Sequence, residues 1–351
     1  MAIKTRLIAV FVLCLITGIG FADGTSATAS PATVVSATDP SAKKLSKKER
    51  LRLKAEADVL FSSGNYSSAL GKYGLLLKYK WKKDDHLLML YNTAVSYRNQ
   101  GEYDKAIEFL LHCTELDPRD ARPHLKLAMI YETIHLYGEA TKSYKRTLEL
   151  GKEKFECYSG LGRIYQGLGL NGQAVEHYRQ ALLIRSTNEI YRQLSRCYET
   201  LNNRELAASM LKQVISQEGE AASVSDYLQL SFLYSIQQKY EDALGTISTA
   251  INKWPDNREL KFHLITIHFK KGDIKQARAL VGAMIEMEPE DALAHFLMGL
   301  IAYFEKSPGN LKTVKQEMER AAAIAKTPML KEYSEIFVKH LSGETEATGK
   351  R

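Results

Sequence analysis

A helical pattern that returns about every 34 residues is the feature that most constrains how this chain can fold. Its clearest copy, residues 155–188, holds two segments in which small and aromatic residues recur at three- and four-residue spacing, separated by a glycine-rich turn. Such spacing places these residues on one face of a helix, so each copy predicts two short helices joined by a tight turn. Gly162 and Ala174 are expected at the crossing of the two helices, because larger side chains would overpack it.

The copies align on one alanine column and one aromatic column. The alanines, 33 to 37 residues apart, are Ala69, Ala106, Ala140, Ala174, Ala207, Ala243 and Ala277. The aromatic residues are Tyr97, Tyr131, Tyr165, Tyr198 and Tyr234. The predicted hairpins span residues 50–83, 87–120, 121–154, 155–188, 188–221, 224–257, 258–291 and 292–326, and an amphipathic helix follows at 328–341. A period of this kind predicts a solenoid in which each hairpin packs on its neighbours and the last helix covers the final apolar face.

On these columns the chain resembles the tetratricopeptide-repeat family. The motif residues of the clearest copy are Tyr158, Leu161-Gly162, Tyr165, Ala174 and Tyr178, and Pro118, Pro255 and Pro289 stand at the family's closing proline in other copies. The resemblance implies an all-α, right-handed solenoid of about eight helix-turn-helix hairpins with a C-terminal capping helix. It also implies that the first helices of the hairpins line a concave groove that binds a peptide or a partner's helix.

The N-terminal segment has the composition of an export signal. Residues 1–22 combine basic residues, an apolar run and a small-residue site that predicts cleavage after Ala22. An uncleaved anchor is the alternative, although the run is short for a membrane span. Residues 23–45 are rich in Ala, Ser, Thr and Pro and predict a flexible tether, and residues 342–351 a polar tail. We therefore expect an exported protein, periplasmic or secreted, without a membrane span after cleavage.

The first helix of the solenoid has a recognisable start. Ser46 and Glu49 have the spacing of a capping box, in which the serine hydroxyl and the glutamate carboxylate each accept a terminal backbone N–H. The helix is therefore predicted to begin near Lys47.

Motifs for catalysis, metal binding and nucleic-acid binding are not found. The net charge of +7 is modest, and no dense basic patch is interleaved with aromatic residues. Cys113, Cys157 and Cys197 are too far apart for a zinc site and are expected to be buried thiols. Residues 167–172 match the dinucleotide pattern G-x-G-x-x-G, but a helical pattern precedes them where a strand is needed. We predict a protein that is not an enzyme and holds no cofactor or metal.

Two groups of residues on the expected groove are candidates for partner binding. In repeat proteins that serve chaperones, a set of basic residues and asparagines holds a C-terminal carboxylate, and Lys54, Asn92, Arg122 and Lys126 fall at corresponding places. Asp58 replaces the first asparagine and would repel a carboxylate, and the exchange of lysine and arginine changes the donor geometry. Arg163 lies on the same expected surface. In the later hairpins Phe232, Phe262, Phe269 and Phe296 could anchor an apolar segment, or they could be ordinary core.

These observations favour a scaffold or adaptor that mediates protein–protein interaction through its concave groove, in a cell-envelope complex. The alternative is a non-catalytic regulatory or substrate-presenting subunit of an envelope enzyme or secretion machine. The sequence leaves open the partner, the oligomeric state, and whether the compartment is a bacterial periplasm or a eukaryotic secretory pathway.

Overall fold

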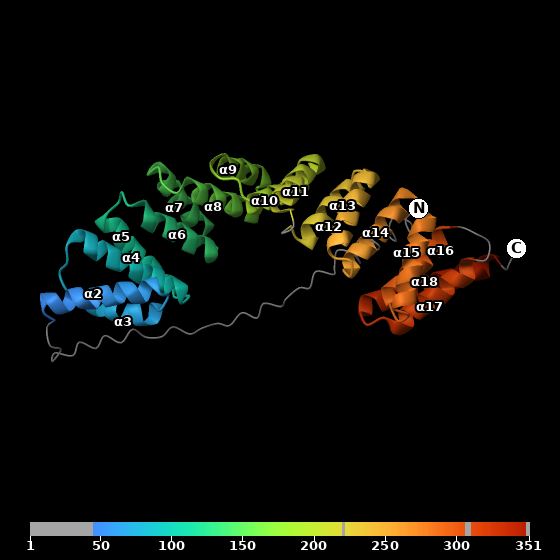
Figure 1. The fold of residues 1–351 in the computed structure, drawn as a ribbon, viewed down its shortest axis with the longest axis horizontal. Helices are drawn as coiled ribbons and strands as arrows, with labels where there is room; N and C mark the ends of the chain where they lie inside the picture. The colour runs from blue at the N-terminus through green and yellow to red at the C-terminus, as the bar shows by residue number, and fades with distance from the viewer. Residues whose placement is uncertain (1–44, 220–221, 306–309, 349–351) are drawn as a thin grey trace. The chain divides into compact units, whose positions relative to one another are not determined.

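The computed structural model describes residues 45–219, 222–305 and 310–348, and the regular structure in these ranges consists of helices (Figure 1). The expected signal peptide at 1–22, the tether as far as residue 44, residues 306–309 of the eighth turn and the last three residues of the tail lie outside the described residues. In the described ranges, no helix is long and apolar enough to span a membrane.

The helices pair in chain order into the eight predicted hairpins. The hairpins are α2 Lys47–Ser62 with α3 Tyr66–Leu76, α4 Lys83–Asn99 with α5 Tyr103–Leu116, α6 Ala121–Thr133 with α7 Tyr137–Glu149, α8 Lys154–Gly167 with α9 Asn171–Ile184, α10 Asn188–Thr200 with α11 Arg204–Glu218, α12 Val224–Ile236 with α13 Tyr240–Lys253, α14 Arg258–Lys271 with α15 Ile274–Met287, and α16 Ala292–Phe304 with α17 Asn310–Ile324. The predicted all-α repeat architecture is confirmed.

The last helix is longer than predicted. Helix α18, Pro328–Thr348, continues seven residues beyond Leu341, into the segment expected to be a polar tail. Residues 342–348 hold no proline and only one glycine, which costs a helix about 1 kcal/mol, so nothing in the segment stops the helix.

The chain divides into two compact units, and the division falls inside α11, between Gln213 and Val214. We call described residues 45–213 the N-terminal unit and described residues from 214 onward the C-terminal unit. Within each unit, helices that are consecutive in the chain lie side by side (Figure 1).

The alanine column lies at the crossings of the helices. All seven alanines have an exposed fraction of 0%, so each is in full contact with its surroundings. A Cβ atom added at Gly162 would lie 2.5 Å from the ring of Tyr178 on α9, and one added at Gly160 would lie 2.2 Å from the ring of Tyr144 on α7. Helix α8 therefore approaches both neighbouring helices closely only because these two positions lack a side chain. The predicted register of the repeats is confirmed.

The start of the first hairpin also agrees with the prediction. The Ser46 hydroxyl accepts the backbone N–H of Glu49 at 3.3 Å, and the Glu49 carboxylate accepts the backbone N–H of Ser46 at 2.7 Å. These two bonds satisfy terminal donors that the helix itself leaves free, and α2 begins at Lys47 as expected.

Candidate protein-binding surface

Lys54 and Asn92 are held by partners within the N-terminal unit. The Tyr73 hydroxyl donates to Asp58 Oδ1 at 2.7 Å and accepts a hydrogen bond from Asn92 Nδ2 at 3.1 Å. Lys54 Nζ lies 3.0 Å from Asp58 Oδ2 and 3.6 Å from Asp85. Burial and the neighbouring Asp58 raise the pKa of Tyr73, which keeps its hydroxyl protonated as a donor. The aspartate that replaces the expected asparagine thus organises a partly buried network between α2, α3 and α4.

Arg122 is also engaged within the unit. Its guanidinium donates to both oxygens of Asp120, at 3.0 Å from Nε to Oδ1 and 2.7 Å from Nη2 to Oδ2, and lies over the Tyr91 ring at 5.4 Å. A similar combination occurs in the C-terminal unit, where the aspartate and the ring stand 171 residues after Asp120 and Tyr91 but the arginine comes from another repeat position. There Arg258 pairs with Asp291 and lies over the Phe262 ring at 5.1 Å. A guanidinium between an aromatic ring and a helix-capping aspartate is therefore a repeated structural device of this chain.

Arg163 belongs to a network that joins three helices. Its Nε lies 2.6 Å from Glu132 Oε1 on α6, and its Nη2 lies 3.0 Å from Glu132 Oε2. The Tyr144 hydroxyl on α7 donates to Glu132 Oε2 at 2.6 Å. Burial, followed by the charge of Glu132, raises the pKa of Tyr144. Arg163 is 46% exposed and can touch a partner, but its charge is already neutralised by Glu132.

Lys126 differs from the other basic residues that the sequence singled out. It is half-buried on α6, and half-buried Arg98 on α4 is near enough for its charge to act on Lys126. Within the described residues neither side chain pairs with a carboxylate. Burial first, and Arg98 second, lower the pKa of Lys126, and the charge of Glu153 opposes them only in part. We call Arg98 and Lys126 the cation pair.

The four phenylalanines of the C-terminal unit do not form one exposed group. Phe262 and Phe296 are 4% and 2% exposed and belong to the hydrophobic core. Phe269 is partly buried, packs against the same core and meets the edge of the Phe304 ring at 5.2 Å. These three residues follow the core alternative that the sequence left open, so the deeply buried Phe262 and Phe296 cannot be surface anchors without rearrangement. Phe232 is half-buried and stays a candidate.

Lys270 was not singled out from the sequence, yet it lies beside Phe232. Its ammonium is 5.7 Å from the centre of the Phe232 ring. Lys270 is half-buried near the end of α14, and burial lowers its pKa.

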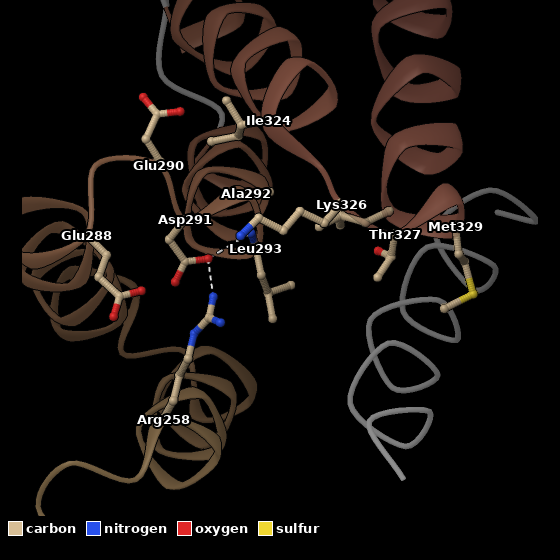
Figure 2. A pocket seen from close by; sticks show the side chains of 11 residues that line it. Arg258, Glu288, Glu290, Asp291, Ala292, Leu293, Ile324, Lys326, Thr327 and Met329 are labelled. Carbon is tan, nitrogen blue, oxygen red and sulfur yellow. Dashed lines mark hydrogen bonds and ion pairs between the residues drawn. The ribbon is translucent and has the colours of Figure 1, made fainter. Parts of the chain in front are cut away.

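A cavity of about 400 Å³ lies in the C-terminal unit, between the start of α14, the loop before α16 and the turn between α17 and α18 (Figure 2). Asp291 caps α16, because its Oδ1 accepts the backbone N–H groups of Leu293 and Ala294 at 3.0 and 3.1 Å and also pairs with Arg258. Glu290, on the cavity rim, pairs with Arg320. Arg258, Asp291 and Glu290, three of the charged residues that line this cavity, are thus engaged in contacts between helices.

The residues considered for other chemistry have structural roles. Cys113, Cys157 and Cys197 are free and buried, as predicted, and burial raises the pKa of their thiols to about 12, 12 and 11. The segment 167–172 is the turn between α8 and α9, with Gly169 at φ +75°, so a helix precedes it instead of a strand. In the described part of the chain, no group of three or more His, Cys, Asp or Glu residues could hold a metal ion.

Comparison with known proteins identifies repeats in both units. Family models described as tetratricopeptide repeat match residues 88–120, 155–188 and 236–301. Sperm-associated antigen 1 of Homo sapiens is 36% identical over 103 residues, which are 28% of this chain and 11% of that protein. The photosystem I assembly protein Ycf3 of Rippkaea orientalis is 30% identical over 97 residues, 28% of this chain and 51% of that protein.

The solved structure of Naa15/Naa10 bound to HypK-THB superposes with a TM-score of 0.50 at 17% identity, over 82% of this chain and 44% of the solved chain. At this identity the likeness shows the fold alone. The chain spans only 11%, 24% and 34% of the first three curated relatives that it matches.

Proposed function

Because this chain is built from tetratricopeptide repeats, we propose that it is a non-catalytic scaffold or adaptor whose first helices bind a segment of a protein partner. The observation that carries the proposal is the cation pair on α4 and α6. Two half-buried cations whose charges act on each other are unfavourable, because each loses hydration and repels the other, and the charge of Glu153 offsets this cost at Lys126 only in part. An incoming carboxylate would relieve both costs, and complementary charge of this kind sets the specificity of protein interfaces.

The proposed ligand group at the cation pair is a carboxylate, from either an acidic side chain or a chain terminus. The four-residue clamp expected from the sequence would need Lys54, Asn92 and Arg122 to leave their present partners. We therefore place the contact at Arg98 and Lys126 instead. Peptides with a free and an amidated C-terminus separate the two sources, since only a terminal carboxylate is lost on amidation.

The test compares affinity capture by three full-length proteins: wild type, Arg98→Met/Lys126→Met, and Lys145→Met. Lys145 is an exposed lysine on the second helix α7 and serves as the matched control. The expected result is a partner held by wild type and by Lys145→Met and weakened about tenfold or more by the double substitution, the size expected for losing charged hydrogen bonds. Equal capture by all three proteins would contradict the proposed site.

We further propose that the protein works after export, in a complex of the cell envelope. The basic, apolar and small residues of segment 1–22 support export, and the name of the Rippkaea relative as an assembly protein supports a scaffolding role. The intact mass of the protein from its native source tests the export step: a chain that begins at Asp23 is expected, and one that keeps residues 1–22 would contradict cleavage.

A further inference from the structure

The C-terminal unit has a second basic site that is independent of the cation pair. Helices α12 and α14 contact each other, and Phe232 and Lys270 meet across this contact with 5.7 Å between the ammonium and the ring centre. Both side chains are half-buried, so each loses part of its hydration but keeps a face toward solvent.

The charge of Lys270 is not neutralised by its surroundings. The adjacent Lys271 pairs with Glu241 at 2.9 Å and with Asp273 at 3.0 Å, and His268 lies 3.5 Å from Asp273. Lys270 pairs with no carboxylate among the residues that the structure describes. Burial alone lowers its pKa, with no neighbouring acid to oppose the effect. Helix α14 thus carries two consecutive lysines, of which only the exposed Lys271 pairs with carboxylates.

His263, seven residues before Lys270 on the same helix, adds no charge to the site at neutral pH. It is 9% exposed, and its Nε2 has no hydrogen-bond partner in the described structure. Burial, and then the charge of Lys270, lower the pKa of His263 to about 4, so its ring is neutral at neutral pH. The site therefore presents a single positive charge. A monovalent carboxylate matches one ammonium, whereas a phosphate dianion would need further cations.

We propose that Lys270 and Phe232 bind an acidic side chain of a protein partner, with the carboxylate on the Lys270 ammonium and the adjoining apolar atoms against the Phe232 ring. This inference rests on the proposed function and names the partner chemistry for the C-terminal unit. Charge-assisted hydrogen bonds to an ammonium are stronger than neutral ones, and a half-buried aromatic ring adds apolar contact area beside them. Lys270 is then a specificity-determining residue that favours glutamate or aspartate over the neutral amides.

The experiment uses an array of immobilised peptides in which each glutamate-containing sequence has a glutamine counterpart. The full-length protein is applied as wild type, Lys270→Met, Lys270→Arg, Lys271→Met and Arg98→Met/Lys126→Met. Methionine keeps the aliphatic stem and removes the charge, arginine keeps the charge, and Lys271 is the matched neighbour. Thermal melting checks that each variant is folded.

In wild type, a subset of peptides is expected to bind about tenfold more tightly with glutamate than with glutamine. For that subset the preference disappears in Lys270→Met and survives in Lys270→Arg, Lys271→Met and the double variant. A preference that survives in Lys270→Met, or is lost only in the double variant, overturns the inference and leaves the proposed function standing. An array on which wild type binds no peptide removes the proposed function and this inference with it.

Discussion

Replacing Gly162 by alanine tests the close packing on which the repeat register depends. The new Cβ would lie 2.5 Å from the ring of Tyr178, which is 0% exposed and whose hydroxyl donates to Gln166 Oε1 at 2.9 Å. Alanine gains about 1 kcal/mol over glycine in a helix interior, and overpacking costs about 1–3 kcal/mol. Because the ring is fully enclosed and hydrogen-bonded, the upper part of this range applies. We expect a net loss of about 1–2 kcal/mol of unfolding free energy.

The measurement is thermal or urea unfolding followed by circular dichroism. For a unit of this size, a loss of 1–2 kcal/mol lowers the melting temperature by about 2–8 °C. Gly71→Ala is the matched control, because Gly71 lies in the middle of α3 with nothing within 4 Å of an added Cβ. That substitution should raise stability by up to about 1 kcal/mol. If both variants shift in the same upward direction, α8 and α9 are not in the close contact described here.

Three further predictions concern ionisable groups. Burial alone would raise the pKa of Asp120, but the hydrogen bonds from Arg122 outweigh it and lower this pKa. The pair therefore stabilises the fold above about pH 4, and the stabilisation is lost as the pH falls through the lowered folded pKa. In Asp120→Asn, the urea midpoint should decrease less steeply over this acidic range than in wild type. Burial lowers the pKa of His263 from its ordinary value of 6.5 to about 4 in the folded protein. Between these two values the unfolded chain binds more protons, so the free energy of unfolding should fall by at most about 1.4 kcal/mol per pH unit on acidification. His263→Gln should remove this pH dependence. The three buried thiols should react slowly with a disulfide reagent in the native protein and rapidly in denaturant, since only the thiolate reacts; fast native labelling would contradict their burial.

Much of the fold could be predicted from the sequence because the repeats depend on local spacing. The column alanines mark helix crossings, and a crossing tolerates only small side chains, so the column and the packing follow the same physical rule. Prediction was weaker at the end of the chain. The polar composition after Leu341 suggested a tail, but polarity does not stop a helix, and α18 continues to Thr348.

The candidate site was harder to predict, because the column pattern places a residue on a helix without showing what its side chain meets. Lys54 and Lys126 are both basic residues on the first helix of a hairpin, but Asp58 pairs with Lys54, whereas the positive charge of Arg98 acts on Lys126. Likewise, helical spacing could not separate Phe262, which is core, from half-buried Phe232.

Lys270 did leave a signal in the sequence. It stands seven residues before the column alanine Ala277, where the other six copies have Ser62, Asn99, Thr133, Gly167, Thr200 and Ile236. The other six copies pack with an uncharged residue at this position. Packing of the repeat therefore does not explain why the seventh copy has a lysine. The fold gives this lysine two favourable contacts, the C-terminal turn of α14, where cations are stabilised, and the Phe232 ring. Since Lys271 takes the nearby carboxylates of Glu241 and Asp273, neither contact neutralises the Lys270 ammonium, and this remaining charge is what the proposed acidic partner would meet.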